Sequence, residues 1–351
     1  MVRVSLRFSQ PASAREDKKG ARSLTLNSPS ISVIIPFRNA SAYLERCLAA
    51  VAASHHKNYE LILVDDGSTD SSPQIALRYA DRIITLPSSR GPAFARNRGA
   101  EQARGEILFF LDSDVLCFPD TLDLVEEIIR QRSDLDAVIG SYDDDPPETN
   151  FISRYKNLTH HFVHQNSSTD ASTFWTGCGG VRRQVFLKLN GFDESYDRPS
   201  IEDIELGYRL RSAGGKIRLS KRLVVKHAKR WNLLSLLRSD ILDRAIPWTY
   251  LQLSHGWILD DLNLTRRQRA SAFLVSLAAL LAILGLWRRW FFTAIIPCLI
   301  PVLYWNWKLY HFYYRRGGLW FALGAIGMHW FYYLYSAFGF TVGSVKYRFR
   351  A

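Results

Sequence analysis

Residues 106–114 of this 351-residue chain read Glu-Ile-Leu-Phe-Phe-Leu-Asp-Ser-Asp, and this stretch is the most informative about the fold. The apolar run is typical of a buried strand, and it leads directly into Asp112 and Asp114. Because an unpaired buried carboxylate is costly, we expect the two acids to meet a cation or solvent where the strand ends. Paired carboxylates suit hard divalent ions such as Mg2+ or Mn2+. An Asp-rich turn without any ligand is the alternative that so short a pattern leaves open.

Further short apolar runs surround this stretch, and each is followed by a helical pattern. Strands are predicted at 31–36, 60–64, 82–86 and 136–140. Helices are predicted after a cap at Ser41, after Thr69 and Asp70, over 91–103, and from Pro119 to about residue 132. This alternation predicts a mainly parallel, doubly wound α/β sheet. Ligands bind such sheets at the carboxyl ends of the strands, where Pro36, Asp65-Asp66 and Asp112-Ser-Asp114 all fall.

The formal net charge of +12 comes from the end of the chain. No Asp or Glu follows Asp261, whereas eleven Lys and Arg residues do, and the preceding residues hold 34 basic against 33 acidic side chains. These late cations alternate with long apolar runs, a pattern typical of a membrane surface and not of a nucleic-acid-binding stripe. We therefore expect a membrane partner and no nucleic acid.

Three apolar stretches in this region, 270–287, 290–307 and 319–343, approach or exceed the roughly 20 residues that cross a bilayer. Trp, Tyr and Arg crowd their ends, as expected at headgroup level. We expect two or three transmembrane helices over 266–351, in a multi-pass protein of the cell (inner) membrane. The cluster Arg266, Arg267 and Arg269 favours a catalytic domain on the cytoplasmic side. Three full spans would put the last three cations outside, so two spans plus an interfacial helix are the alternative.

Composition predicts the remaining domain boundaries. Residues 1–29 are polar and lack the apolar core of a secretory signal, so we expect a mobile leader there. Residues 30–230 carry the α/β pattern, and residues 231–265 look like an amphipathic, interfacial helical linker. The four cysteines (Cys47, Cys117, Cys178 and Cys298) have no zinc or disulfide spacing, which fits a reducing compartment.

Six sequence blocks follow one another along the first 230 residues. They are Ile31-Ser-Val-Ile-Ile-Pro-Phe-Arg-Asn39, Val64-Asp-Asp-Gly-Ser-Thr-Asp70, Ala95-Arg-Asn-Arg-Gly99, Leu111-Asp-Ser-Asp114, Asn190-Gly-Phe-Asp-Glu194 and Glu202-Asp203. Together and in this order they resemble the inverting, nucleotide-sugar-dependent glycosyltransferases of family 2, which have the GT-A fold. The resemblance covers residues 30–230 and implies a Rossmann-like catalytic domain, followed here by the α-helical membrane tail.

The resemblance places the sugar donor against the first blocks. Asp66 would read the nucleotide base, because a carboxylate can accept the imide N–H of uracil. Pro36, Phe37 and Arg38 would line the same base pocket. Arg96 would lie near the diphosphate or the ribose, where a fixed cation helps. The alternatives are a helix-capping role for Asp66 and a solvated helix-face position for Arg96.

The resemblance also implies a metal site. Asp112 and Asp114 match the family's metal motif, with Asp114 the more direct ligand and Asp112, together with Ser113, nearer the sugar or ribose. His227, in Val-Val-Lys-His, sits where many members carry a histidine that completes the site. Bound Mg2+ or Mn2+ would stabilise charge on the departing nucleotide. Taken alone, His227 would be an ordinary surface or core histidine.

The later blocks would serve the acceptor. Asp203 matches the family's catalytic base, which takes the proton of the acceptor hydroxyl in a single in-line displacement. Glu202 would orient the acceptor. Without the other blocks, a simple capped helix start would be the better explanation of these acids. Gly179, in the run 177–180, would bring backbone close to the sugar or phosphates. Trp231 would contact the acceptor, because His227-Ala-Lys-Arg-Trp231 is similar to the Gln-x-x-Arg-Trp motif of processive synthases. It has His for Gln and follows Asp203 too soon, which argues against processivity.

We therefore expect a membrane-attached enzyme that transfers a sugar, with inversion, from a nucleoside-diphosphate donor to a lipid-linked or saccharide acceptor of the cell envelope. The resemblance favours a UDP-linked donor. A sugar-phosphate nucleotidyltransferase is the enzymatic alternative, but its first strand precedes a Gly-rich basic loop, which Pro36-Phe-Arg-Asn39 is not. A catalytically idle, membrane-bound nucleotide-sugar-binding or assembly protein is the other alternative. The intact Asp66, Asp112, Asp114 and Asp203 argue against it.

Overall fold

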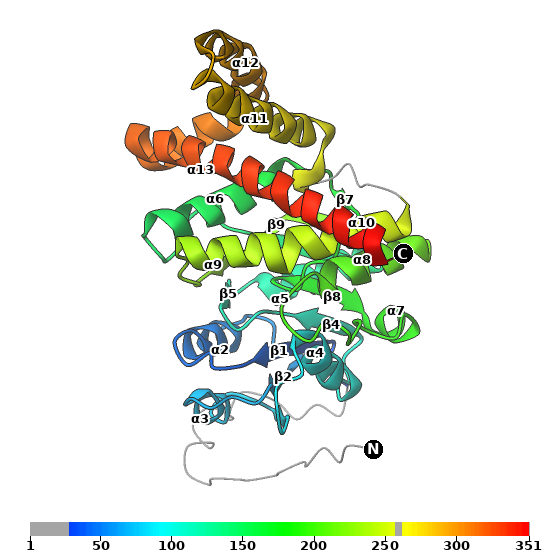
Figure 1. Cartoon of the computed structure of the whole chain (residues 1–351). Helices are drawn as coiled ribbons and strands as arrows, with labels where there is room; N and C mark the ends of the chain where they lie inside the picture. Colours follow the sequence, from blue (N-terminus) through cyan, green and yellow to red (C-terminus); the bar gives the residue numbers. More distant parts are fainter. Residues whose placement is uncertain (1–27, 257–261, 351) are drawn as a thin grey trace. The chain divides into compact units, whose positions relative to one another are not determined.

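The computed structural model describes residues 28–256 and 262–350, so almost all of the leader predicted at 1–29 lies outside the described residues. The described chain forms two compact units (Figure 1). The first comprises residues 28–148 and 169–229, and the second residues 149–168 and 230–350 without 257–261. Helix α6 (Phe151–Asn166) therefore belongs with the C-terminal helices, although it lies inside the stretch 30–230 that composition assigns to the α/β domain.

A nine-stranded mixed sheet forms the centre of the first unit, in the order β3-β2-β1-β4-β8-β6-β9-β5, with β7 paired to β9. The strands are β1 (Ile31–Phe37), β2 (Tyr59–Asp65), β3 (Arg82–Thr85), β4 (Ile107–Phe110), β5 (Val115–Cys117), β6 (Ala137–Tyr142), β7 (Asp170–Ala171), β8 (Gly179–Arg182) and β9 (Ile217–His227).

The prediction of a mainly parallel sheet is right for one half of it and wrong for the other. Strands β3, β2, β1 and β4 pair in parallel, as do β6 and β9. Strand β8, however, is antiparallel to both β4 and β6, and β5 and β7 are antiparallel to β9. The chain reaches β8 from β7 through residues 172–178 without a helix. Residue patterns predict a strand but not its direction, and large α/β sheets commonly contain antiparallel strands.

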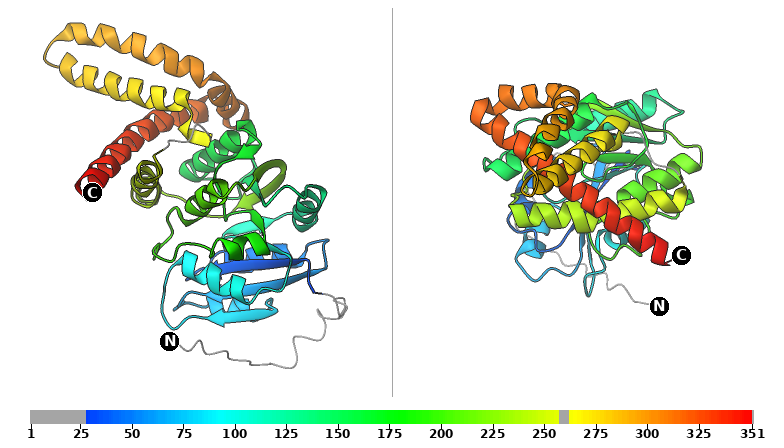
Figure 2. Two further views of the ribbon diagram at one scale, coloured as in Figure 1. Left: turned by 90° about the vertical axis from the view of Figure 1, so that its right-hand side faces the viewer. Right: turned by 45° about the horizontal axis from the view of Figure 1, so that its top comes forward.

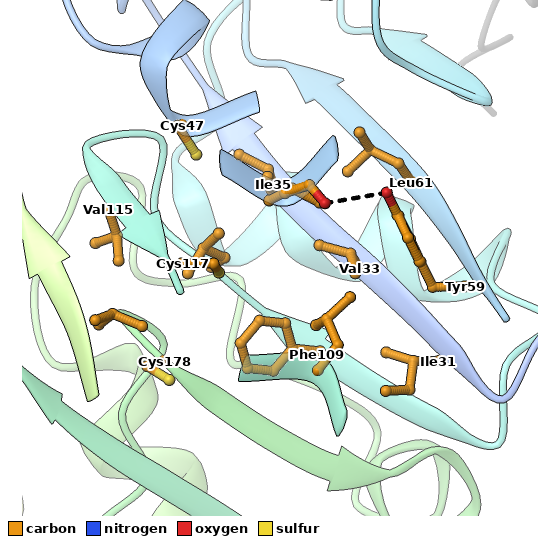
Figure 3. Close-up of a cluster of buried hydrophobic side chains, with 14 of the residues drawn as sticks. Ile31, Val33, Ile35, Cys47, Tyr59, Leu61, Phe109, Val115, Cys117 and Cys178 are labelled. Atoms are coloured by element: carbon orange, nitrogen blue, oxygen red, sulfur yellow. Dashed lines mark hydrogen bonds between the residues drawn. The ribbon is translucent and has the colours of Figure 1, made fainter. Parts of the chain in front are cut away.

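Helices cover both faces of this sheet, as a sheet buried on both sides requires. The helices are α2 (Leu44–Ala52), α3 (Ser72–Ala76) and α5 (Thr121–Gln131) on one face, and α4 (Pro92–Glu101), α7 (Arg183–Lys188) and α8 (Glu202–Ser212) on the other. Strand β1 shows the alternation: Val33 and Ile35 join the cluster of the first face, whereas Ile34 joins that of the second. Figure 3 shows the first cluster, in which β1 side chains lie near Phe109 and Cys117.

The loops that follow β1 and β2 are hydrogen-bonded to each other, and this corrects one predicted helix start. Helix α2 begins at Leu44 with Tyr43 at its N-cap, because a turn closed on the Ala40 carbonyl precedes it, so Ser41 does not cap the helix. The Ser41 N–H donates to Asp70 Oδ2 at 3.1 Å. Asp70 Oδ1 accepts the N–H of Ser72 at 3.0 Å, where α3 begins. Asn39 Oδ1 accepts the N–H of Thr69 at 2.8 Å. These bonds hold together the edge of the sheet where the predicted site residues lie.

The second unit is helical. Besides α6 it contains α9 (Leu233–Leu237), the π-helix η1 (Arg238–Ala245), α10 (Ile246–His255), η2 (Leu262–Leu264), α11 (Arg266–Gly285), the 3-10 helix η3 (Arg289–Ala294), α12 (Ile295–Trp305) and α13 (Trp307–Arg350). Helix α11 and the η3–α12 segment form a hairpin, drawn in yellow and orange in Figure 2. Helix α13 is kinked at Gly318, whose φ is 75°. Asp240, inside the π-helix, pairs with Lys156 of α6 at 2.5 Å and accepts from Tyr335 of α13 at 2.8 Å.

Within the described residues, α11 is the one helix that is long and apolar enough to cross a membrane by itself. The segments Arg289–Trp305 and Trp307–Phe349, bent by 69° at their junction, pass the same test only as a pair. Residues 28–256 and 262–350 thus offer one or at most two candidate spans for the two or three that were predicted. The apolar stretch 290–307 is divided between a 3-10 segment and an 11-residue helix that contains Pro301.

Candidate functional site

Arg96 lies at the centre of the predicted donor residues and joins two of the sequence blocks. It stands on α4 and is buried, with a side chain 5% exposed. One guanidinium nitrogen, Nη2, donates to Asp112 Oδ1 and the other, Nη1, donates to Glu202 Oε1, both at 2.7 Å. Burial alone would lower the pKa of Arg96, but the carboxylates of Asp112, Glu202 and Asp203 raise it. The guanidinium is therefore a fixed positive charge and not a solvated surface arginine.

Asp114 and His227 face each other across the pair of strands β5 and β9. Val115 is the register partner of His227, which places the residue before Val115 next to the imidazole. His227 Nε2 lies 3.7 Å from Asp114 Oδ2. Burial alone would raise the pKa of the Asp114 carboxyl, but His227 and the positive charge of Lys229 lower it to about 2. Asp114 is consequently ionised at neutral pH.

Asp114 and His227 can supply two ligands to a divalent ion, but not a complete set of protein ligands. Across residues 28–256 and 262–350, no group of three or more His, Cys, Asp or Glu side chains is arranged to hold a metal ion. A carboxylate oxygen and an imidazole nitrogen are nevertheless suitable ligands for Mn2+, and Mg2+ commonly takes one or two carboxylates plus substrate phosphates. Asp112, predicted as a further ligand, has its Oδ1 engaged by Arg96, and its role as a ligand stays a prediction.

Asp203 is held in the first turn of α8 by groups on two segments. Its Oδ2 accepts the backbone N–H of Thr176 at 3.2 Å and the Thr176 hydroxyl at 3.3 Å, while its Oδ1 accepts the N–H of Ile204 at 2.8 Å. The side chain is half-buried, whereas the neighbouring Glu202 is buried. Three hydrogen bonds orient the Asp203 carboxylate without removing it from solvent, as a proton acceptor requires.

The predicted base pocket is only partly open. Asp66 is buried, and its carboxylate accepts the Ser89 hydroxyl at 2.8 Å and the N–H groups of Arg90 and Gly91 at 2.7 and 3.1 Å. Asp66 thus anchors the segment that leads into α4, and reading the base stays a prediction for it. Pro36 and Phe37 are buried in β1, with Phe37 in the core cluster, whereas Arg38 is exposed. The exposed edge of this pocket is accordingly at Arg38.

Packing within the chain explains two of the residues predicted at the acceptor. A Cβ on Gly179 would lie 2.4 Å from the carbonyl oxygen of Trp175, so this glycine is required by the protein itself. Trp231 belongs to the second unit, where it is 7% exposed and its N–H donates to Ser153 Oγ at 2.7 Å. Acceptor contacts by Gly179 and Trp231 stay predictions. Ser113 is half-buried between the two aspartates.

Three residues that the sequence did not single out support the site. Asn97 Nδ2 donates to the Phe192 carbonyl at 2.8 Å and Asn97 Oδ1 accepts the Phe192 N–H at 2.9 Å, which ties α4 to the block at 190–194. Thr176 orients Asp203. Tyr142 stacks on His227 with ring centroids 4.3 Å apart. Tyr142 follows the strand predicted at 136–140, and its place at a strand's carboxyl end was the available signal.

Part of the chain is similar in sequence to known glycosyltransferases. Residues 32–189 match the family model described as Glycosyl transferase family 2. An uncharacterized glycosyltransferase of Haemophilus influenzae is 41% identical over 103 residues, which are 28% of this chain and 41% of that protein. The putative teichuronic acid biosynthesis glycosyltransferase TuaG of Bacillus subtilis is 34% identical over 140 residues, 38% of this chain and 56% of that protein. The chain thus spans about half, or less, of the length of these curated relatives.

One solved structure has a similar fold. Mannosyltransferase PcManGT from Pyrobaculum calidifontis, in complex with GDP-Man and Mn2+, superposes with a TM-score of 0.50. The superposition covers 80% of this chain and 88% of that chain at 18% sequence identity. At this identity the likeness is one of fold.

Proposed function

We propose that this chain, a family 2 glycosyltransferase over residues 32–189, transfers a sugar with inversion from a nucleoside-diphosphate donor to a hydroxyl of a lipid-linked or cell-envelope acceptor. One observation carries the proposal: the Asp112–Arg96–Glu202 bridge brings residues of three distant blocks together beside Asp203. A fixed cation, a pair of side chains suited to a divalent ion and an oriented carboxylate are what a single displacement at a sugar diphosphate requires.

The reaction forms one bond and breaks one. The acceptor oxygen attacks the anomeric carbon from the face opposite the diphosphate, and the bond from that carbon to the diphosphate oxygen breaks. Asp203 takes the proton of the acceptor hydroxyl as the new bond forms. Arg96 supplies a positive charge that needs no reorganisation on the donor side, where negative charge collects on the nucleoside diphosphate.

Asp114 and His227 would hold a divalent ion, Mg2+ or Mn2+, through one carboxylate and one imidazole. When bound, this ion would supply charge stabilisation to the leaving diphosphate. Both side chains are largely buried, and His227 Nε2 lies 3.7 Å from Asp114 Oδ2, which supports this assignment. The mannosyltransferase of similar fold carries GDP-Man and Mn2+.

The nucleotidyltransferase alternative has less support. Such an enzyme needs free backbone N–H groups after its first strand to hold a triphosphate. Here the N–H groups of Asn39, Ala40 and Ser41 donate to Ser68, Ser72 and Asp70 at 3.1, 2.8 and 3.1 Å. They are therefore engaged by the neighbouring loop.

Thermal unfolding of the purified full chain with a panel of UDP-, GDP- and dTDP-sugars, with and without Mn2+, tests the proposed donor. We expect one UDP-sugar to raise the Tm in the presence of Mn2+, because a ligand at 100 times its Kd adds about 2.7 kcal/mol of stability. The gain should vanish in EDTA and in His227→Ala. No response to any nucleotide sugar, together with a response to a nucleoside triphosphate, would refute the transfer reaction and favour nucleotidyl transfer.

We further propose that the α11–α12 hairpin crosses the membrane twice and that α13 lies along the interface. The 20 residues of α11 reach about 30 Å at ~1.5 Å per residue. The second leg is shorter in residues, but its 3-10 part rises ~2.0 Å per residue, so η3 and α12 together reach about 28 Å. Both legs therefore match the ~30 Å hydrocarbon core.

Contacts within the second unit support the interfacial position of α13. Tyr333 of α13 donates to Gln268 Oε1 at 2.6 Å and to Asn306 Oδ1 at 3.1 Å, which lie at the start of α11 and directly after α12. Helix α13 thus contacts the base of the hairpin. In this arrangement only Arg288 and Arg289 of the eleven late cations lie on the far side, as the positive-inside rule favours.

Labelling of single cysteines in sealed membrane vesicles with an impermeant maleimide tests this topology. The three substituted positions, Trp287, Phe349 and Ser133, are all exposed. Trp287→Cys, at the tip of the hairpin, should react on one side of the membrane, and Phe349→Cys and Ser133→Cys on the other. The wild-type chain is the blank, because Cys47, Cys117, Cys178 and Cys298 are all buried. Reaction of Phe349→Cys from the same side as Trp287→Cys would contradict an interfacial α13.

A further inference from the structure

Tyr142 and His227 form a stacked pair beside the proposed metal position. Their rings are nearly parallel, at 5°, with centroids 4.3 Å apart. Both side chains are buried, Tyr142 at 9% and His227 at 7% exposure. Trp175 packs edge-on against Tyr142 with centroids 4.9 Å apart and an angle of 82°. Three aromatic rings from β6, β9 and the turn before β8 are therefore in sequential contact.

The strand register explains why His227 is the residue that reaches Tyr142. In the first part of the β6–β9 pair, Ile139 is opposite Leu219, and the same register would place Tyr142 opposite Arg222. The register shifts after Ile139, so that Tyr142 is opposite Val225 instead, three residues further on. Because side chains alternate between the faces of a strand, an odd shift exchanges the face that β9 presents. His227, and not Lys226, then shares the face of Tyr142.

A flat neighbour restricts the second of the two torsions that aim the imidazole. Rotation of the His227 ring about its Cβ–Cγ bond would drive the ring edge into the face of Tyr142. The stack therefore fixes the plane of the imidazole, and within that plane Nε2 lies 3.7 Å from Asp114 Oδ2. Groups that orient a metal-binding histidine without touching the metal commonly change metal affinity by about 10- to 100-fold.

The same aromatic contacts continue toward the proposed base. A Cβ on Gly177 would lie 2.4 Å from Cζ2 of Trp175, so the indole lies directly over this turn. The residue between them, Thr176, donates two hydrogen bonds to Asp203. Tyr142 thus stands between the side chain that would bind the ion and the turn that orients the carboxylate.

We propose that Tyr142 is a positioning residue that sets the orientation of His227 for divalent-ion binding through ring stacking, with Trp175 holding Tyr142 in place. The inference rests on the proposed metal pair Asp114 and His227. It assigns to Tyr142 an effect on the ion that is separate from the fold and from nucleotide binding without metal.

Binding of Mn2+ to the full chain in the presence of UDP, followed by the electron paramagnetic resonance of free Mn2+, tests the proposal without any turnover. Tyr142→Leu should weaken Mn2+ binding about 10-fold, whereas Tyr142→Phe, which keeps the ring, should stay within about threefold. Tyr142→Met fills a similar volume with a flexible chain and carries the same expectation as Leu, should the Leu variant unfold. Tyr79→Leu, a partly buried tyrosine next to Glu45, is the matched control.

Two reference measurements separate the possible failures. UDP affinity in EDTA should be unchanged in Tyr142→Leu, whereas a general loss of structure would lower it. If His227→Ala loses Mn2+ binding but Tyr142→Leu and Tyr142→Met retain it, the positioning role is wrong and the metal pair stands. If Tyr142→Phe is as weak as Tyr142→Leu, stacking is not the cause. If His227→Ala binds Mn2+ as tightly as the wild type, both the metal pair and the role of Tyr142 are overturned.

Discussion

Asp203→Asn is expected to lower kcat by about 100- to 10,000-fold, the range over which a positioned general base contributes. The asparagine side chain has the same size as the aspartate, and its amide oxygen can still accept the hydrogen bond from the Thr176 N–H. The turn at residue 176 and the start of α8 should therefore remain in place. It can no longer take up the acceptor's proton. Steady-state kinetics with the donor found by thermal stabilisation, combined with donor binding by calorimetry, check the prediction.

Donor affinity should change little in this variant, because Asp203 faces the acceptor side of the proposed site. Asp120→Asn is the matched control, since Asp120 is an exposed aspartate at the start of α5 that makes no side-chain capping bond. Wild-type turnover in Asp203→Asn would eliminate this residue as the base and direct attention to Glu202 and Glu205.

Arg96→Met is expected to destabilise the first unit by about 3–5 kcal/mol, the cost of removing one partner from a buried charge pair. Glu202 is 5% exposed, and without Arg96 its carboxylate loses the guanidinium that compensates it. Donor binding should also fall, because Asp112 loses the contact at 2.7 Å that holds its carboxylate. Thermal or chemical unfolding of the full chain, with calorimetry for the donor, measures both effects.

A double variant separates electrostatics from packing in this prediction. Arg96→Met combined with Glu202→Gln removes the uncompensated charge, so it should recover a large part of the stability while donor binding stays weak. Arg96→Lys should recover less, because a single ammonium cannot reproduce two bonds made by different nitrogens of one planar group. If Arg96→Met is as stable as the wild type, the Asp112–Arg96–Glu202 bridge contributes no net stability.

Local patterns were sufficient to locate most of the candidate site. The apolar runs at β1, β2 and β4 each end in polar residues, and parallel pairing necessarily brings those ends to one edge. For this reason Asp66, Asp112 and Asp114 could be placed near one another from the sequence. The helix cap at Ser41 was wrong because a turn closed on the Ala40 carbonyl delays the start of the helix to Leu44.

The same local patterns could not predict which side chains from distant parts of the sequence contact each other. Arg96 and Glu202 are 106 residues apart, and nothing in either block indicates that one guanidinium spans two carboxylates. Asp66 is engaged by the segment before α4, and Gly179 by the carbonyl of Trp175, for similar reasons. Such contacts depend on which elements pack together.

By itself, the sequence determined that this protein has an α/β domain with its acids at the strand ends, followed by a basic, apolar tail, because residue periodicity and charge are local properties. Only the tertiary structure decided that β8 runs antiparallel, that α6 joins the C-terminal helices, and that a register shift brings His227 to Tyr142. The physical reason is that strand direction and register are set by burial and hydrogen bonding between distant segments, which no single segment encodes.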